Sequence, residues 1–79
     1  MAYYVYMLLC RDGSFYIGYA KNVERRFRQH RKGLGARYTR MHTPERIVYV
    51  EKVDSKKEAM RRERRLKSLS HSRKEKLVR

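Results

Sequence analysis

Hydrophobic and aromatic residues dominate two short stretches near the start of the chain, residues 3–10 and 14–19. Segments this rich in aromatic and branched side chains predict strands. The Asp12-Gly13 pair between the two stretches is typical of a hairpin turn. We therefore expect the chain to begin with an antiparallel hairpin.

Two turns are compatible with this hairpin, and they place its tyrosines differently. A two-residue turn would put Tyr6 and Tyr16 on opposite faces, because side chains alternate along each strand. A three-residue turn with Gly13 in the left-handed conformation would pair Tyr6 with Gly18 and bring both tyrosines to one face. We prefer this turn because it separates an apolar face from a tyrosine-rich face. The apolar face then consists of Val5, Met7, Leu9, Phe15, Ile17 and Tyr19, and the other face of Tyr4, Tyr6, Leu8, Tyr16 and Gly18.

A helical pattern follows the hairpin. Asn22 is a favourable N-cap and Gly33 a favourable helix end, so the spacing predicts a helix from residue 23 to about residue 32. One stripe of this helix carries Val23, Phe27, His30 and Leu34. His30 thus stands where an ordinary amphipathic helix places a leucine, and Arg26 precedes it by one turn on the flank of the stripe.

The second half of the chain predicts one more strand and two more helices. The apolar run over residues 47–50 indicates the strand, after a segment rich in turn-forming and basic residues. Capping boxes at residues 55–58 and 72–75 indicate where the two helices begin. One stripe of the first of them consists of Ala59, Glu63, Leu66 and Ser70. The predicted fold class is α+β, a small three-stranded antiparallel sheet flanked by helices in the order β-β-α-β-α-α.

Length and charge narrow the class of protein. A chain of 79 residues allows one domain, so we assign residues 1–79 to a single domain. The formal net charge of +14 favours a polyanionic partner, and nucleic acid is the first candidate. The cations are spread along the chain rather than confined to one lipid-facing stripe, so we expect no membrane partner.

The sequence also bears on disulfide bonds, cellular location, zinc sites and phosphate-binding loops. Cys10 is the only cysteine, so no internal disulfide can form, and we expect it to be a core residue in a reducing compartment. The apolar start lacks a basic lead-in and a cleavage site, and it is shorter than a membrane span, which favours the cytoplasm. No zinc spacing and no phosphate-binding loop occurs.

The tyrosine-rich face carries the first candidate chemistry. Tyr6 and Tyr16 would lie beside Gly18, which leaves space for a ligand backbone or phosphate. Arg26 could clamp a phosphate in the same pocket, or it could be one more solvated cation. His30 is a second candidate there, and its alternative role is that of an ordinary hydrogen-bonded core histidine.

Glu63 is the sharper signal, because its carboxylate lies on the helix stripe that should meet the sheet. Such a carboxylate costs free energy unless it meets a cation. One explanation is a structural ion pair with one of the many Arg or Lys residues. The other is a magnesium ligand, since Mg²⁺ is often held by one carboxylate together with waters and substrate phosphate oxygens.

Taken together, these segments resemble the GIY-YIG nuclease family. The matching segments are Tyr4-Val5-Tyr6, Tyr16-Ile17-Gly18, Arg26 with His30, and Ala59-Met60-Arg61-Arg62-Glu63. The likeness covers nearly the whole chain, whose size is similar to that of the small stand-alone bacterial members. The resemblance implies a three-stranded antiparallel sheet with flanking helices, and a site that cuts phosphodiester bonds in DNA with one divalent ion, Mg²⁺ or Mn²⁺. Tyr4 stands where the family has glycine, and the late asparagine of many larger members is absent.

The resemblance also implies roles for individual residues. Tyr6 and Tyr16 match the two motif tyrosines, one of which is expected to help deprotonate the attacking water. Arg26 matches the arginine that stabilises the pentacovalent phosphate, and His30 matches the histidine that follows it. Glu63 matches the metal-binding glutamate. Because an ordinary tyrosine has a pKa near ~10, we expect nearby positive charge to lower the pKa of the reacting phenol.

Other basic and aromatic residues are expected to contact DNA without reading its sequence. The candidates are Lys21, Arg25, Arg37, Tyr38, Arg40 and Lys67. The leading hypothesis is a metal-dependent DNA endonuclease of repair or recombination that acts on branched or damaged duplex. We expect no small-molecule cofactor, and a partner protein is a candidate source of specificity. Two alternatives stay open: a nucleic-acid-binding module with this fold but little cutting activity, and a basic protein that docks on ribosomal RNA.

Overall fold

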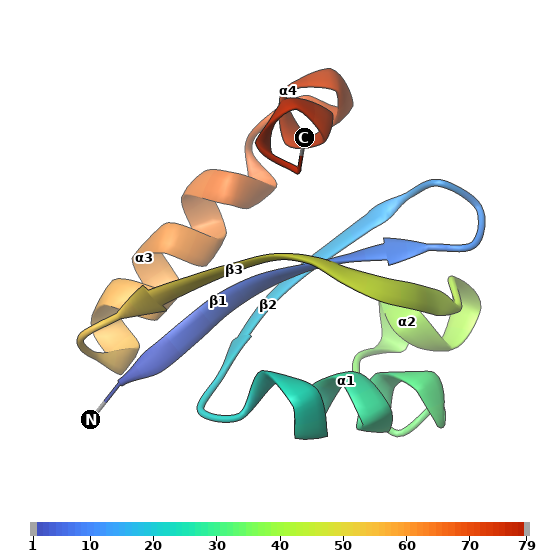
Figure 1. The fold of residues 1–79 in the computed structure, drawn as a ribbon, viewed down its shortest axis with the longest axis horizontal. Coiled ribbons are helices and arrows are strands. Elements are labelled where there is room, and N and C mark those ends of the chain that lie inside the picture. The colour runs from blue at the N-terminus through green and yellow to red at the C-terminus, as the bar shows by residue number, and fades with distance from the viewer. Residues whose placement is uncertain (1, 79) are drawn as a thin grey trace.

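The computed structural model describes residues 2–78 and places the predicted hairpin in a three-stranded antiparallel sheet (Figure 1). The strands are β1 (Tyr3–Cys10), β2 (Phe15–Ala20) and β3 (Pro44–Val53). Their order in the sheet is β2-β1-β3, so β1 is central and β2 is an edge strand. The third strand is much longer than the four residues that the apolar run indicated, because it stays paired with almost the whole of β1.

The hairpin has the three-residue turn. Tyr6 lies opposite Gly18 in the β1–β2 register. Gly13 has a φ of 85°, and its N–H donates to the carbonyl of Cys10 at 2.9 Å. This left-handed conformation is open to glycine at little cost. The prediction that Tyr6 and Tyr16 share one face is therefore confirmed.

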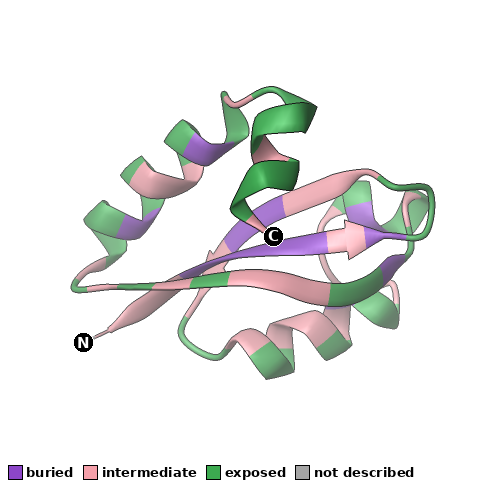
Figure 2. Cartoon of the chain, turned by 45° about the horizontal axis from the view of Figure 1, so that its top comes forward, coloured by how far each residue is buried: buried purple, intermediate pink, exposed green. Residues whose placement is uncertain are grey.

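Helices cover both faces of the sheet (Figure 1). On one face lies α1 (Val23–Arg31), which begins at the predicted N-cap, where the Asn22 side chain accepts from the Arg25 N–H at 3.0 Å. On the other lies α3 (Lys56–Lys67), capped by Ser55. After it, α4 (His71–Leu77) carries largely exposed residues, as Figure 2 shows. The predicted α+β class and element order are confirmed, with one short helix added.

The added helix is α2 (Arg37–Met41), which lies in the segment where the sequence indicated only turns and basic residues. It follows Gly33, whose φ of 78° ends the preceding helix as expected. Leu34 was expected on the buried stripe of that helix, and this was wrong, because the chain turns away at Gly33 and leaves the leucine 72% exposed.

The start of the last helix also differs from expectation. The cap is Ser70, whose hydroxyl accepts from the Arg73 N–H, and it lies two residues before Ser72, the first residue of the predicted capping box at residues 72–75. Ser70 itself was expected on the stripe of the preceding helix, but that helix ends at Lys67. A serine can cap from either position, and the chain uses the one that lets Val78 pack against the core.

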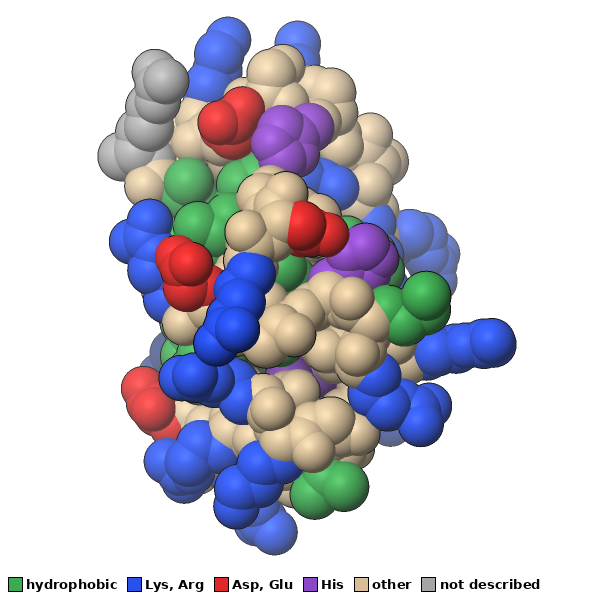
Figure 3. Space-filling model, turned by 90° about the vertical axis from the view of Figure 1, so that its right-hand side faces the viewer, with side chains coloured by type: hydrophobic (Ala, Val, Ile, Leu, Met, Phe, Trp, Pro, Cys, Tyr) green, Lys and Arg blue, Asp and Glu red, His purple; other side chains and the backbone are tan. Residues whose placement is uncertain are grey.

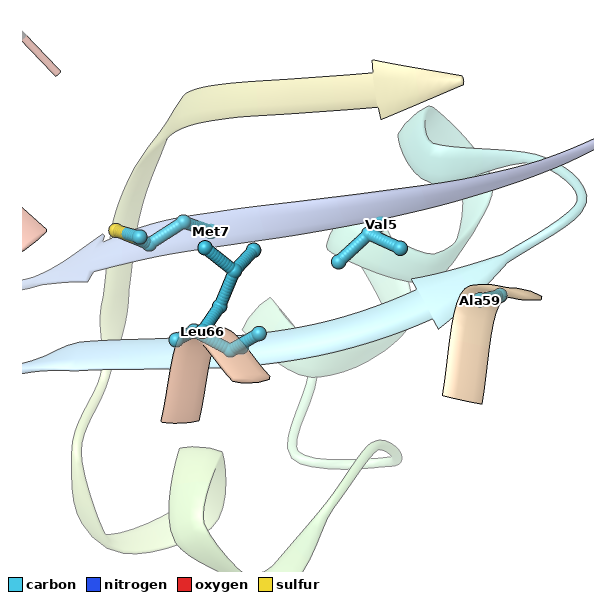
Figure 4. Close-up of a cluster of buried hydrophobic side chains, with 5 residues drawn as sticks. Val5, Met7, Ala59 and Leu66 are labelled. Atoms are coloured by element: carbon cyan, nitrogen blue, oxygen red, sulfur yellow. The ribbon is translucent and has the colours of Figure 1, made fainter. Parts of the chain in front are cut away.

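The main core lies between the sheet and α3. It consists of Val5, Met7, Ile17, Ala59 and Leu66, and Figure 4 shows side chains of the strands and of this helix facing one another. The opposite face of β1 is buried as well, because α1 covers it, and Tyr6 is only 1% exposed. A simple separation into polar and apolar sides would place the tyrosine-rich face in solvent. In the structure this face is instead covered. Cys10 is buried, as predicted. No helix within residues 2–78 has the length and apolar character needed to cross a bilayer.

We expect Leu66→Ala to lower the free energy of unfolding by about 2–5 kcal/mol, because it removes a fully buried side chain between α3 and the sheet. The matched control is Leu34→Ala, which truncates an exposed leucine and should change stability by less than about 0.5 kcal/mol. Urea unfolding of both variants measures the difference. Equal losses would contradict this description of the core.

Candidate active site

Four elements contribute side chains to one open hollow of about 370 Å³ beside the edge strand β2. Arg26 comes from α1 on one side of the sheet and Glu63 from α3 on the other. They can meet at one place because β2 is an edge strand of the sheet. The residues that line the hollow are Tyr6, Tyr16, Gly18, Tyr19, Arg26 and Glu63. Both predicted tyrosines, the arginine and the glutamate are therefore brought together.

Gly18 is the residue that makes room for the Tyr6 hydroxyl. A Cβ atom at this position would lie 2.7 Å from the Tyr6 Oη and 3.0 Å from the Tyr16 ring. The centroids of these two tyrosine rings are 6.3 Å apart. Any side chain at position 18 would thus force Tyr6 to shift, because real Cβ contacts at 2.7 Å do not occur. The glycine was expected to leave space for a ligand backbone or phosphate. The space next to its Cα is instead occupied by the Tyr6 hydroxyl, although Gly18 also lines the hollow.

His30 does not line the hollow but lies directly behind Tyr6. It is 1% exposed, and its Nε2 is 2.9 Å from the Tyr6 Oη. Its other ring nitrogen, Nδ1, is 2.7 Å from the hydroxyl of Thr39. His30 is therefore a hydrogen-bonded core residue, and one of its two partners is the phenol of Tyr6, a candidate catalytic group.

Burial and charge set the protonation of these groups. Burial and, to a smaller extent, the nearby positive charge of Arg26 together lower the pKa of His30 to about 4. The imidazole is therefore neutral at neutral pH. Burial raises the pKa of Tyr6 and of Tyr16, and the opposing effect of Arg26 is too small to reverse this. The expectation that positive charge would bring a phenol toward ionisation is not met by the protein's own residues.

Glu63 reaches the hollow with its side chain 21% exposed, and its Oε2 lies 3.7 Å from the Lys67 Nζ one turn along the helix. Within residues 2–78, no three or more His, Cys, Asp or Glu side chains gather closely enough to enclose a metal ion. A divalent ion held here would therefore take one protein carboxylate and complete its shell with water and substrate oxygens. This donor set fits Mg²⁺, which keeps several waters and binds through one or two carboxylates and phosphate oxygens.

Two residues of the site were not singled out from the sequence. Gln29 accepts a hydrogen bond from the Arg26 Nη1 at 2.9 Å and so orients the guanidinium. Its spacing of three residues on one helix was the available signal. Tyr19 was assigned to the core, and it does pack there, yet it also lines the hollow because it lies on the edge strand.

The six residues predicted to contact nucleic acid fall into two groups. Tyr38 and Lys67 line a second, smaller hollow that adjoins the first at Tyr16. The other four, Lys21, Arg25, Arg37 and Arg40, are exposed and line neither hollow. Figure 3 shows Lys and Arg side chains projecting around most of the outline of one face, with few acidic side chains among them. A diffuse cationic surface of this kind suits contacts to a phosphate backbone.

The low pKa of His30 gives stability a pH dependence with a definite sign. In the unfolded chain this group takes up a proton near pH ~6.5, whereas the folded pKa is about 4. Stability should therefore fall as pH falls between these values, by about 3 kcal/mol, and should be unaffected by this group above them. Urea unfolding across this window should show a shallower slope for His30→Gln than for the wild type. The exposed Leu34 provides the control, because Leu34→Ala removes no titratable group and should keep the wild-type slope.

Comparison with known proteins agrees with this geometry. Residues 2–76 match the model of the GIY-YIG catalytic domain. A UPF0213 protein of Natronomonas pharaonis is 53% identical over 96% of this chain and 89% of its own length, and one of Staphylococcus saprophyticus is 45% identical over 96% and 93%.

Two solved structures are also similar. The solution NMR structure of a UPF0213 protein from Bacillus halodurans has a TM-score of 0.61 at 50% identity, covering 99% of this chain and 83% of that one. That of a protein from E. faecalis has a TM-score of 0.64 at 39% identity, covering 96% and 81%. The chain therefore belongs to the GIY-YIG family, among small relatives that consist of little more than the catalytic domain.

Proposed function

We propose that this protein is a metal-dependent DNA endonuclease that hydrolyses phosphodiester bonds with low sequence specificity. The observation that supports this most is the hollow in which Tyr6, Tyr16, Arg26 and Glu63 meet, although they come from four different elements. A phenol, a guanidinium and a carboxylate around one open space are the groups that phosphodiester hydrolysis requires. The family, whose members are nuclease-type domains, makes DNA the natural substrate.

Arg26 would bind the scissile phosphate. Its planar fork of N–H donors matches two phosphate oxygens, and in a partly buried site such bonds strengthen as negative charge develops on phosphorus. The hydrogen bond from its Nη1 to Gln29 holds the guanidinium in place before the substrate arrives. Less reorganisation is then needed in the transition state.

Tyr6 would accept the proton of the attacking water, and His30 makes this possible. When the Tyr6 hydroxyl donates to the His30 Nε2, its oxygen keeps lone pairs that can accept from a water in the hollow that Tyr6 lines. As the phenol oxygen takes the water proton, its own proton moves to the neutral imidazole, so no buried phenolate forms. A bound phosphate would offset the repulsion between Arg26 and the resulting imidazolium. Of the two motif tyrosines, this favours Tyr6 as the base.

Glu63 would hold the divalent ion, Mg²⁺ or Mn²⁺, at the edge of the same hollow. Such an ion, when bound, supplies positive charge beside the phosphate and makes a water more acidic. Lys67, now 3.7 Å from the carboxylate, would then be free to contact the DNA backbone. Glu63 would thus form an ion pair with Lys67 when no metal is bound, and it would be a metal ligand when the ion is present.

The substrate would be DNA whose backbone can enter an open hollow at a sheet edge. Branched, flapped or damaged duplex presents such a backbone more readily than regular duplex, which suggests a role in repair or recombination. The diffuse cationic surface binds without reading bases. A partner protein would then supply the choice of target.

A second candidate function is that of a nucleic-acid-binding module that cuts little. It is favoured by the Glu63–Lys67 ion pair and by the raised pKa of both tyrosines. Such a module needs no carboxylate as a metal ligand, so its DNA affinity should not depend on Glu63. Glu63 therefore separates the two candidates.

Glu63→Gln should lower magnesium-dependent nicking by 10²-fold or more, about the loss expected when an essential electrostatic group is removed. DNA affinity should stay the same or rise, because a negative charge is lost from the binding surface. Nicking of branched and linear DNA, with and without Mg²⁺ or Mn²⁺, measures the first effect, and fluorescence anisotropy the second. Arg26→Ala should lose both nicking and some affinity.

The same helices offer matched controls. Glu58→Gln removes a carboxylate from the exposed start of α3, and Arg28→Ala removes an exposed guanidinium from α1. Both variants should nick at close to the wild-type rate. A wild-type protein that binds DNA but shows no metal-dependent nicking on any of these substrates would favour the binding module instead.

The affinity for DNA should fall steeply and linearly in a plot of log K against log salt, because cations on the surface release counterions from the backbone. Arg25→Ala, on the exposed side of α1, should lower this slope by about one and weaken binding to all sequences alike. Anisotropy titrations at several salt concentrations, without divalent ions, measure the slope. A flat response would contradict backbone binding.

A further inference from the structure

The segment from Gly33 to Met41, which the sequence did not predict to be ordered around the site, encloses the far side of His30. Thr39 in α2 is 2% exposed, and its Oγ1 lies 2.7 Å from the His30 Nδ1. The same hydroxyl donates to the carbonyl of Ala36 at 2.9 Å. A buried chain of polar groups therefore runs from the Ala36 carbonyl through Thr39 and His30 to Tyr6.

The direction of the hydrogen bonds along this chain follows from counting protons. A threonine hydroxyl has one proton, and here it is donated to the Ala36 carbonyl. The Thr39 oxygen can then only accept from His30, so the proton of the neutral imidazole lies on Nδ1. The other nitrogen, Nε2, is left unprotonated and accepts from the Tyr6 hydroxyl.

The alternative tautomer has weaker support in the same geometry. With a proton on Nε2, the Nδ1 atom would need a donor. The Thr39 hydroxyl could donate to it at 2.7 Å only by giving up its bond to the Ala36 carbonyl, and the Ala36 N–H is available only at 3.4 Å. That tautomer would also donate to the Tyr6 oxygen, so His30 could no longer accept the phenolic proton. The two tautomers thus differ in whether Tyr6 can pass on its proton.

The backbone at Gly35 restricts the position of the His30 ring. A Cβ atom on this residue would lie 2.1 Å from the His30 Nδ1, so the backbone of the loop is packed directly against the imidazole. On the other side the ring contacts Tyr6, and its centroid is 4.9 Å from that of Tyr16. The imidazole can therefore change its tautomer, whereas its position is fixed by the surrounding atoms.

We propose that Thr39 is a positioning residue that holds His30 in the Nδ1–H tautomer and thereby keeps Nε2 ready to accept the proton of Tyr6. Its effect on cleavage rests on the proposed nuclease function. Its effect on the tautomer does not, and can be measured separately. In the reaction, the water proton goes to the Tyr6 oxygen and the Tyr6 proton to Nε2, which leaves an imidazolium whose Nδ1–H still donates to Thr39.

The test compares Thr39→Val with Thr39→Ser. Valine keeps the shape of threonine but removes the hydroxyl, and serine restores the hydroxyl with one methyl group fewer. Long-range ¹H–¹⁵N NMR spectra of the uniformly labelled protein at neutral pH distinguish the two tautomers of each histidine. We expect the Nδ1–H form of His30 in the wild type and in Thr39→Ser, and a shift toward the Nε2–H form in Thr39→Val.

Cleavage should follow the tautomer. Thr39→Val should lower the nicking rate at saturating DNA by about 10²-fold, the lower end of what proton transfer by a positioned base contributes. Thr39→Ser should stay within a few-fold of the wild type, and DNA affinity should not change in either variant. Thr43→Val is the control, because this exposed threonine lies outside the buried chain of polar groups.

Each outcome bears on the proposal. An Nε2–H tautomer in the wild type overturns it, as does a Thr39→Val variant that keeps the Nδ1–H tautomer and full activity. Should Thr39→Val not fold, the wild-type and Thr39→Ser spectra decide alone. A wild-type protein with the expected tautomer and no nicking would leave the positioning of His30 intact and refute the nuclease function instead.

Discussion

The hydrogen bond between Tyr6 and His30 joins the central strand to the helix that covers one face of the sheet. Both groups are almost completely buried, so each would leave an unsatisfied polar atom if the other were removed. The bond therefore contributes to folding and to the site at once. The glycine opposite Tyr6 and the loop glycine beside His30 are both placed where any larger residue would push one of these rings away.

The sequence predicted much of this arrangement, because the relevant signals are local. The turn glycine and the alternation of the strands specified the hairpin register, and with it the shared face of Tyr6 and Tyr16. The meeting of Arg26 and Glu63 could be inferred only as a resemblance, since they lie on opposite sides of the sheet. What brings them together is the edge position of β2, and strand order is not a local property.

Other features could not be predicted because tertiary contacts decide them. The short helix α2 has no regular apolar pattern, and its buried residue is a threonine rather than a leucine. Thr39 joins it to the preceding helix through a hydrogen bond to His30. The burial of both faces of β1 likewise depends on a helix that the strand's own sequence does not indicate. The prediction that Leu34 is a core residue assumed that the helical stripe continues past Gly33, where the helix in fact ends.

The division between core and surface also explains how a chain of such high charge stays folded. The apolar residues between α3 and the sheet supply the stability, while nearly all cations point outward. One of the few well-formed ion pairs is that of Arg62 with both carboxylate oxygens of Glu51, at 2.8 and 2.9 Å. Anions bound by the folded form would relieve the remaining repulsion and so stabilise it.

The edge position of β2 has a consequence for assembly. The outer side of an edge strand carries backbone groups that are free to form a ladder with a further strand. The hollow opens at this same border, so a chain that extended the sheet there would cover the tyrosines and Gly18. Under the proposed function, growth of the sheet by one strand and entry of DNA would therefore compete for the same border.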